Sequence, residues 1–438
     1  MNLDERLEHV AVVGAAGKMG SGISLLLARE LAWRAIERPD RLFVLNLIDI
    51  SHQSLQGLLD YLKEQLVKEG EKAINRLRTA FRDRADLVEN GEMIEAFAWA
   101  GLRQVRAGTT LALAKDAHLV FEAALEREDL KTNLFRELAG VCGPHTFFLS
   151  NTSSIPLGGL AQAAGIPGRL IGCHFYNPPA VQRLIEVITP ADCDPELVAQ
   201  THDLAARLGK LVVPANDIAG FIGNGHFMRD GLHGLREAER LAAEHGLPKA
   251  IALMDAVSRE WLVRPMGIFQ LIDYVGIDVF QLILRVMESY LHDGLHSDLI
   301  DRMIGLGVKG GQTSLGGQKD GFLKYEGGRP VAVYDAETQA YVAIDPAWFD
   351  VLGPRPAPAP SWGAVQRDLD KDGTLRAYFS AVKDSTAAGA ELARRYAAAS
   401  RAASLRLVEQ GVAAEAEHVN QVLTLGFFHA YGPVNEYL

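Results

Sequence analysis

HVAVVGAAGKMGSGISLLLARELAW, residues 9–33, joins a short apolar run, a turn with three glycines and a segment with helical apolar spacing. Strand, glycine turn and helix in this order are typical of a dinucleotide-binding unit, because small residues let the backbone approach a pyrophosphate at the helix N-terminus. A tight turn in any α/β protein would use similar glycines, so the motif alone is weak evidence. The residues of the turn that we expect near a cofactor are Gly14, Gly17, Lys18, Met19 and Gly20.

The next apolar run, residues 41–50, ends in Asp49. An acidic residue at the end of the second strand accepts hydrogen bonds from ribose hydroxyls and disfavours a 2′-phosphate, so Asp49 predicts NAD rather than NADP. Asp49 lies further from the glycines than the usual ~20 residues, and a charged insertion around residues 37–40 accounts for this. The alternative is that Asp49 caps a helix that begins near Ser51.

Apolar β-type runs alternate with helical segments up to about residue 216. This alternation predicts a doubly wound, mainly parallel sheet of Rossmann type in residues 1–216. Open sheets of this kind bind ligands at the carboxyl ends of their strands. Asn151-Thr152-Ser153-Ser154 follows one such strand and is therefore a candidate binding loop, although capping of the following helix is an alternative use of the same residues.

Residues 169–188, RLIGCHFYNPPAVQRLIEVI, place one ionisable residue in each of two apolar runs, His174 and Glu186. Pro178-Pro179 excludes a continuous helix, so we expect a strand, a turn and a returning strand that bring imidazole and carboxylate together. A buried carboxylate next to a histidine raises its basicity and fixes its tautomer, as a general base requires. The alternative is an internal ion pair with a structural role only.

From residue 217 the β pattern fades and helical spacing dominates. We expect a helical domain over 217–350, a linker rich in Pro and Ala over 351–362, and further helices over 363–438. Gly246 and Gly267 recur as Gly411 and Gly432 at the same separation in both pairs. This shared, ungapped offset favours a truncated internal repeat of the helical domain over chance similarity of Ala-rich helices.

Composition limits the partners of the chain. Its 438 residues carry a net charge of −11 with a pI of about 5.7, which disfavours a nucleic-acid partner. No apolar run approaches the ~20 residues of a membrane span, and the acidic start MNLDERLEHV lacks the features of a signal peptide. Three scattered cysteines without metal-ligand spacing suit a reducing compartment. We therefore expect a cytoplasmic protein that binds neither a metal, nor nucleic acid, nor a membrane.

A predicted amphipathic helix over residues 52–85 concentrates basic residues in this acidic chain. Lys63 and Lys68 are the candidates on this helix for contact with a phosphorylated substrate. A solvated face on which lysines alternate with Glu64, Glu69 and Glu71 explains the same pattern equally well.

Five motifs resemble those of the L-3-hydroxyacyl-CoA dehydrogenase family. They are FEAALEREDLK (121–131), SNTSS (150–154), IGCHFYNPPAVQRLIEVI (171–188), GFIGN (220–224) and RPMGIFQLIDYVG (264–276). Their order and spacing are similar over about residues 8–325, and the tail resembles the duplicated C-terminal domain of longer members. The resemblance implies an NAD-dependent enzyme that oxidises L-3-hydroxyacyl-CoA to 3-ketoacyl-CoA.

The resemblance also implies a role for residues that match the family motifs. His174 would be the general base, oriented by Glu186, while Ser153 and Asn224 would contact the substrate oxygen. The positions expected to contact the cofactor are Glu126, Lys131, Asn151, Ser153 and Asn177. Two other functions compete with this one: a dehydrogenase of a CoA-free hydroxy acid or sugar acid on the same scaffold, and a catalytically silent NAD-binding protein.

The resemblance has a consequence for assembly as well. Single-copy relatives bury the apolar faces of their C-terminal helical domain against an identical domain of a second chain. We expect residues 363–438 to replace that partner within one chain and form an intramolecular pseudo-dimer, because tethering gives the second copy a high effective concentration. Further self-association is expected if the truncated copy leaves apolar surface uncovered.

Overall fold

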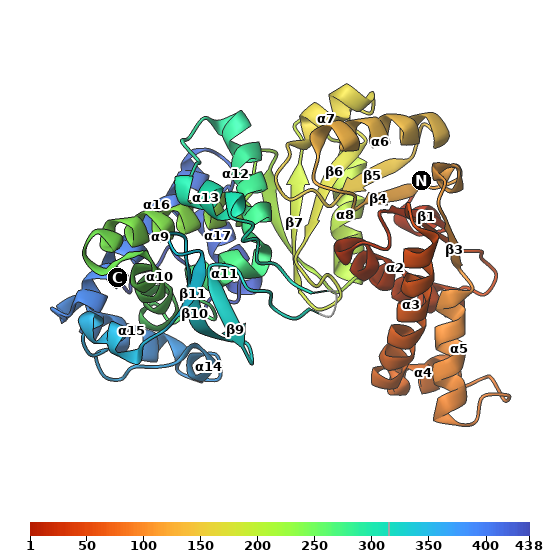
Figure 1. Ribbon diagram of the computed structural model, residues 1–438. Coiled ribbons are helices and arrows are strands. Elements are labelled where there is room, and N and C mark those ends of the chain that lie inside the picture. Colours follow the sequence, from red (N-terminus) through yellow and green to blue (C-terminus); the bar gives the residue numbers. More distant parts are fainter. Residues whose placement is uncertain (314–315) are drawn as a thin grey trace. The chain divides into compact units, whose positions relative to one another are not determined.

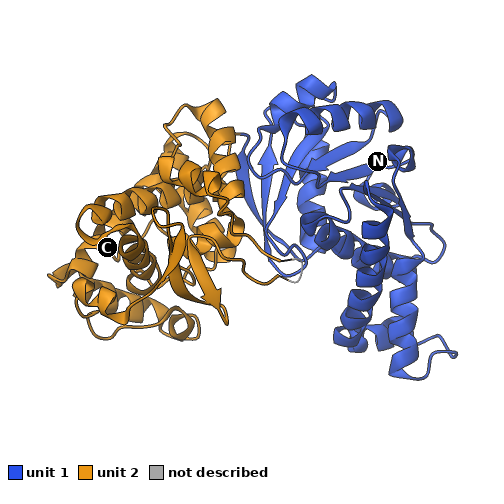
Figure 2. Ribbon diagram, in the orientation of Figure 1, with its two compact units in different colours: residues 1–217 blue, residues 218–438 orange. Residues whose placement is uncertain are grey.

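The computed structural model describes residues 1–313 and 316–438, which form two compact units, Met1–Asp217 and Ile218–Leu438 (Figures 1 and 2). Each unit has its own hydrophobic core. The boundary between the units is adjacent to the predicted one at residue 216. The finer division of the second half into 217–350, 351–362 and 363–438 stays a prediction.

The first unit is an eight-stranded sheet flanked by helices (Figure 1). Its strands are β1 (His9–Val13), β2 (Val44–Ile48), β3 (Val105–Gly108), β4 (Leu119–Glu122), β5 (Phe147–Ser150), β6 (Leu170–Phe175), β7 (Leu184–Thr189) and β8 (Leu211–Asn216). They are ordered β3-β2-β1-β4-β5-β6-β7-β8, and every neighbouring pair is parallel except β6 and β7. The predicted doubly wound, mainly parallel sheet is confirmed.

The helical segments of this unit are α1 (Leu3–Arg6), α2 (Lys18–Glu37), α3 (His52–Lys72), α4 (Ile74–Ala80), α5 (Asn90–Leu102), the 3-10 turn η1 (Leu111–Ala114), α6 (Glu128–Val141), α7 (Leu157–Ala164) and α8 (Pro195–Arg207). The single helix expected over residues 52–85 is wrong, because the chain leaves helical geometry at Ala73 and α4 ends at Ala80. Leu66, Leu77 and Phe81 are buried on both sides of this break. These three residues keep a helix-compatible spacing. The apolar pattern therefore did not indicate the break between α3 and α4.

The second unit is mainly helical, as predicted, but it also contains a small antiparallel sheet that the sequence analysis missed. Its elements are α9 (Gly223–His245), α10 (Leu247–Ala256), the π-helical turn η2 (Val257–Trp261), α11 (Ile268–Val275), α12 (Ile277–Leu291), α13 (Asp298–Gly305), β9 (Leu323–Glu326), β10 (Arg329–Asp335), β11 (Ala340–Ala343), the 3-10 turn η3 (Pro346–Leu352), α14 (Trp362–Val365), α15 (Lys371–Asp384), α16 (Ala388–Glu409) and α17 (Ala416–Leu425). Gly327 and Gly328 connect β9 to β10, both with positive φ. Two glycines between short strands favour a tight hairpin, and this was the overlooked signal.

Helix α16 packs along α9 in the core of the second unit. A Cβ atom added at Gly225 would lie 2.8 Å from Leu407, and one added at Gly234 would lie 3.4 Å from the Tyr396 hydroxyl. Because the partner number falls as the α9 number rises, the two helices run antiparallel. The small residues let the helices approach closely. The C-terminal tail is therefore part of the same core as the first helices of this unit.

Candidate active site

The glycine turn after β1 has a backbone path that leaves no room for a side chain at Gly14 or Gly20. Gly14 has a φ of +75°, and a Cβ atom there would lie 2.6 Å from the Ala123 carbonyl oxygen. A Cβ atom on Gly20 would lie 2.0 Å from the Gly14 carbonyl oxygen, and Gly17 is the residue that caps α2. The turn thus leads directly into a 20-residue helix, and between its glycines it carries only the small side chains of Ala15 and Ala16. This cradle fits the diphosphate of a dinucleotide at the helix N-terminus.

Asp49 lies immediately after β2 and holds the glycine turn. Its Oδ2 atom accepts a hydrogen bond of 2.9 Å from the backbone N–H of Ala16. Ser51, not Asp49, caps α3, since its hydroxyl accepts from the N–H of Ser54 at 3.1 Å. The helix-cap alternative is therefore wrong for Asp49. A carboxylate at this position, beside the turn, fits the ribose of a bound dinucleotide.

The strands β6 and β7 bring the predicted histidine and glutamate together. They pair in antiparallel register with His174 directly opposite Glu186, so the expected strand, turn and returning strand are confirmed. His174 Nδ1 lies 3.0 Å from Glu186 Oε1; the carboxylate is fully buried and the His174 side chain is 11% exposed. With the carboxylate ionised, Nδ1 carries the proton that it donates. Nε2 is then the nitrogen that can accept a proton from another group.

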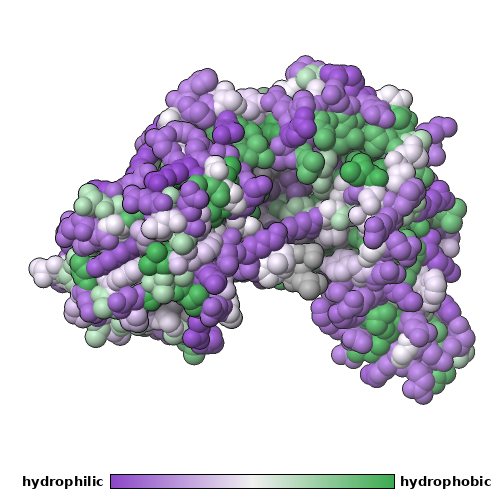
Figure 3. Space-filling model, in the orientation of Figure 1, coloured by the Kyte–Doolittle hydropathy of each residue, from purple (hydrophilic) through white to green (hydrophobic). Residues whose placement is uncertain are grey.

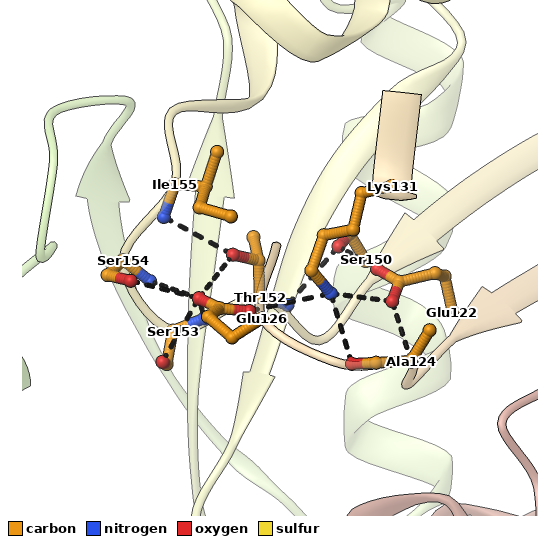
Figure 4. Close-up of polar contacts among 9 residues, drawn as sticks. All are labelled: Glu122, Ala124, Glu126, Lys131, Ser150, Thr152, Ser153, Ser154 and Ile155. Atoms are coloured by element: carbon orange, nitrogen blue, oxygen red, sulfur yellow. Dashed lines mark hydrogen bonds and ion pairs between the residues drawn. The ribbon is translucent and has the colours of Figure 1, made fainter. Parts of the chain in front are cut away.

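A second polar network joins the ends of β4 and β5 (Figure 4). Lys131 donates from Nζ to Glu122 Oε1 at 2.6 Å and lies 3.4 Å from Glu126 Oε2. Glu122 Oε2 also accepts from the hydroxyl of Ser150 at 2.5 Å. Lys131 and Glu122 are both buried. They form a neutralised pair beneath the loop that follows β5, and a buried pair of this kind is favourable only with such additional hydrogen bonds.

Glu126 connects this pair to the loop of residues 152–154. Its Oε1 atom accepts hydrogen bonds from Thr152 Oγ1 at 2.8 Å, from the backbone N–H groups of Ser153 and Ser154 at 2.9 and 3.0 Å, and from both serine hydroxyls at 3.2 and 2.9 Å. Helix α7 has Pro156 as its cap residue, so the capping alternative for these polar residues is wrong. They are arranged around Glu126 instead.

The charges of this network support one another. Burial alone would raise the pKa of Glu126, but the Lys131 ammonium and the hydrogen bonds from Thr152 and Ser153 hold that pKa below its usual value. Burial alone would lower the pKa of Lys131, but the two carboxylates Glu122 and Glu126 raise it. Both groups are therefore ionised near neutral pH. The loop that carries Ser153 is held by a fixed negative charge.

Asn151 ties the same loop to the strand that carries His174. Its side-chain oxygen accepts a hydrogen bond of 3.0 Å from the backbone N–H of Phe175. The ends of β1, β4, β5 and β6 thus bring Gly14, Glu126, Ser153 and His174 to the carboxyl edge of the sheet. Lys131 is buried behind this edge, which suits a positioning role rather than direct contact with a ligand. Asn177 follows β6, and its contact with a cofactor stays a prediction.

Replacing Lys131 by methionine tests whether its buried charge stabilises this network. The variant leaves the buried Glu122 carboxylate without its counter-ion, which should lower the free energy of unfolding by about 3 kcal/mol. Urea unfolding followed by circular dichroism measures the change. Lys115→Met is the matched control, because Lys115 is exposed, and it should change stability by less than about 0.5 kcal/mol. Equal stability of both variants would contradict a structural charge at position 131.

Two sets of predicted residues lie elsewhere. Lys63 and Lys68 are exposed on α3, and Lys68 pairs with Glu64 at 2.5 Å. Figure 3 shows that the helical region containing α3–α5 presents a mostly hydrophilic surface in this view, which is the solvated face considered as the alternative. Asn224 lies in the first turn of α9, in the second unit. The contacts of Lys63, Lys68 and Asn224 with a substrate stay predictions.

The sequence analysis missed a residue next to the histidine. Tyr176 donates from its hydroxyl to Glu186 Oε1 at 2.5 Å, and its ring centroid lies 4.9 Å from that of His174. Tyr176 is the first residue after β6 and lies two positions after His174. In extended backbone this spacing places both side chains on the same face. That spacing from His174 was the signal that could have identified Tyr176.

The described residues contain neither a membrane-spanning helix nor a cluster of metal-ligating side chains. Within residues 1–313 and 316–438, no helix is both long and apolar enough to cross a membrane. Nor do the described residues contain a group of three or more His, Cys, Asp or Glu side chains placed to hold a metal ion.

Comparison with known proteins agrees with this architecture. Residues 9–218 match the model of the 3-hydroxyacyl-CoA dehydrogenase NAD binding domain, and residues 220–320 match that of the 3-hydroxyacyl-CoA dehydrogenase C-terminal domain.

Individual relatives point to the same family. A probable 3-hydroxybutyryl-CoA dehydrogenase of Bacillus subtilis is 32% identical over 282 residues, which is 64% of this chain and 86% of that protein. A protein of the same name from Deinococcus radiodurans is 30% identical over 316 residues, covering 72% and 99%. The crystal structure of 3-hydroxybutyryl-CoA dehydrogenase from Escherichia coli K12 has the same fold, with a TM-score of 0.65 and 24% identity over 98% of this chain and 90% of that one. The chain therefore belongs to the 3-hydroxyacyl-CoA dehydrogenase family and is an NAD-dependent dehydrogenase.

Proposed function

We propose that the enzyme oxidises the 3-hydroxyl group of L-3-hydroxyacyl-CoA esters to a ketone. The observation that carries the proposal is the His174–Glu186 pair, held at the carboxyl edge of an NAD-binding sheet. Relatives named 3-hydroxybutyryl-CoA dehydrogenase support the substrate class.

His174 is the general base of the proposed reaction. Its Nε2 atom takes the hydroxyl proton of the substrate as the C3–H bond breaks, and the oxygen becomes a carbonyl oxygen. Bound NAD supplies the acceptor for the hydride that leaves C3. Glu186 accepts the Nδ1–H hydrogen bond at 3.0 Å, so its negative charge stabilises the imidazolium that forms.

Ser153 is proposed to donate a hydrogen bond to the substrate oxygen as the charge on that oxygen changes. Glu126 fixes Ser153 through the backbone N–H at 2.9 Å, while the serine hydroxyl lies 3.2 Å from the same carboxylate. The longer contact can be exchanged for a substrate oxygen without loosening the backbone. Asn224 is proposed as a second donor to this oxygen, by resemblance.

Initial rates of NADH formation test the proposed substrate class. We expect oxidation of L-3-hydroxyacyl-CoA esters, with a rate that varies across a series of graded chain lengths. The matching free 3-hydroxy acids are the controls, and we expect their kcat/KM to be at least about 100-fold lower, because interactions with remote parts of a substrate contribute to turnover. A free hydroxy acid or sugar acid oxidised more efficiently than every ester would favour the CoA-free alternative.

We also propose that the tail replaces a partner subunit. The support is that α9 and α16 are both long helices, and each is followed by a glycine with positive φ, Gly246 at 76° and Gly411 at 71°. A 10-residue helix then follows in each case, α10 and α17. Because α16 packs antiparallel on α9, the two halves are arranged as the halves of a two-fold interface would be.

A further inference from the structure

One carboxylate oxygen beside the general base receives two donors. Glu186 Oε1 lies 3.0 Å from His174 Nδ1 and 2.5 Å from the hydroxyl of Tyr176. The phenol ring also packs on the imidazole, with 4.9 Å between ring centroids and an interplanar angle of 41°. Histidine and tyrosine therefore compete for the same negative charge while they contact each other.

The phenol is a permanent donor at this position. Burial, followed by the charge of Glu186, raises the pKa of Tyr176 well above its ordinary value. The hydroxyl thus keeps its proton across the pH range in which a histidine titrates. A short O–H···O⁻ hydrogen bond of this kind is stronger than one between neutral groups, so it both fixes the carboxylate and withdraws negative charge from it.

We propose that Tyr176 is a positioning residue that sets how strongly Glu186 stabilises the protonated form of His174. The inference rests on the proposed function of His174 as general base. Phenylalanine would pack on the imidazole equally well, but it could not donate to Glu186. The hydroxyl is therefore the part of the side chain that carries the effect.

Other titratable groups lie around the imidazole on neighbouring elements. Glu186 belongs to β7 and Tyr176 follows β6, while Cys173 is the adjacent residue of β6 and burial raises the pKa of its thiol, which stays neutral. After β5, the neutral amide of Asn151 accepts from the backbone N–H of Phe175, the residue that follows His174. Lys131, on α6, pairs with Glu122, so Glu126, beyond the end of β4, keeps its negative charge. The Tyr176–Glu186 hydrogen bond is thus the contact to perturb.

The full-length variant Tyr176→Phe tests the proposal. Without the phenol hydrogen bond, the negative charge of Glu186 interacts more strongly with His174. The protonated form of His174 therefore persists to higher pH. We expect the acid limb of the pH profile of kcat/KM to move upward by about half to one pH unit, while the KM for NAD is unchanged. Tyr334→Phe, on β10 in the second unit, is the matched control and should leave the profile in place.

A double variant shows whether Tyr176 acts through Glu186. Glu186→Gln removes the negative charge and should move the acid limb to lower pH. On this background Tyr176→Phe should add no further shift, because the two changes affect one interaction. The proposal would be overturned if the acid limb of Tyr176→Phe did not move or moved to lower pH. It would also be overturned if Tyr176→Phe caused an equal shift in the wild-type and Glu186→Gln proteins. If instead His174→Ala turned over normally, the proposed function itself would have failed, and the two failures are thus distinguishable.

Discussion

Replacing His174 by alanine should lower turnover by about 10²–10⁴ and leave NAD affinity almost unchanged. The imidazole is the group at the sheet edge that is hydrogen-bonded to a buried carboxylate through one nitrogen and can accept a proton through the other. Its removal takes away the acceptor for the hydroxyl proton. The glycine turn and Asp49, which fit the dinucleotide, follow β1 and β2 and are not altered.

The measurement is kcat with a saturating hydroxyacyl-CoA ester, together with NAD binding by calorimetry. His145→Ala is a suitable control, because His145 is an exposed histidine in the turn before β5, and it should retain full activity. A folded His174→Ala protein with normal turnover would show that His174 and Glu186 form a structural pair only.

Ending the chain after Gly353 should abolish the monomeric fold of the second unit. The removed helices contribute Leu375, Tyr378, Phe379 and Tyr396 to its core, and all four side chains are fully buried. Burial of each large apolar side chain is worth roughly 1.5–3 kcal/mol. Their combined loss is comparable to the whole stability of a typical domain, about 5–15 kcal/mol. We expect the truncated protein to form dimers or aggregates through the exposed face of α9.

Size-exclusion chromatography with light scattering measures this outcome. The control is a full-length protein with a protease site inserted between residues 356 and 360, cleaved after folding. Its tail is cut but present, so the two fragments should stay associated and active. A soluble, active monomer of residues 1–353 would show that the tail does not replace a partner subunit.

The sequence predicted the elements whose apolar pattern is simple. Residues 10–13 and 170–173 are continuous apolar runs, and both belong to buried strands of the sheet. Strand β3 was missed because Val105, Arg106, Ala107 and Gly108 form no apolar run and lie at the edge of the sheet, partly exposed. The pairing of β3 with β2 depends on tertiary contacts that no local pattern encodes.

Part of the candidate site was predictable from the sequence, and part was not. His174 and Glu186 stood out as ionisable residues in apolar runs, and the turn between them restricted their pairing to antiparallel strands. The burial of Lys131 was not predictable, because its partner Glu122 also binds Ser150, 28 positions away in sequence. Such a contact depends on the register of β4 against β5, which the sequence alone does not specify.

The most direct test of the proposed function follows the hydrogen at C3 of the substrate. L-3-hydroxybutyryl-CoA carrying deuterium at C3 is incubated with the full-length enzyme and NAD, and the reduced cofactor is analysed by mass spectrometry. The proposed function predicts one deuterium in each NADH formed, an equal amount of 3-ketoacyl-CoA, and no product with His174→Ala. Unlabelled NADH, or no reduction of NAD while the free hydroxy acid is oxidised, would contradict it.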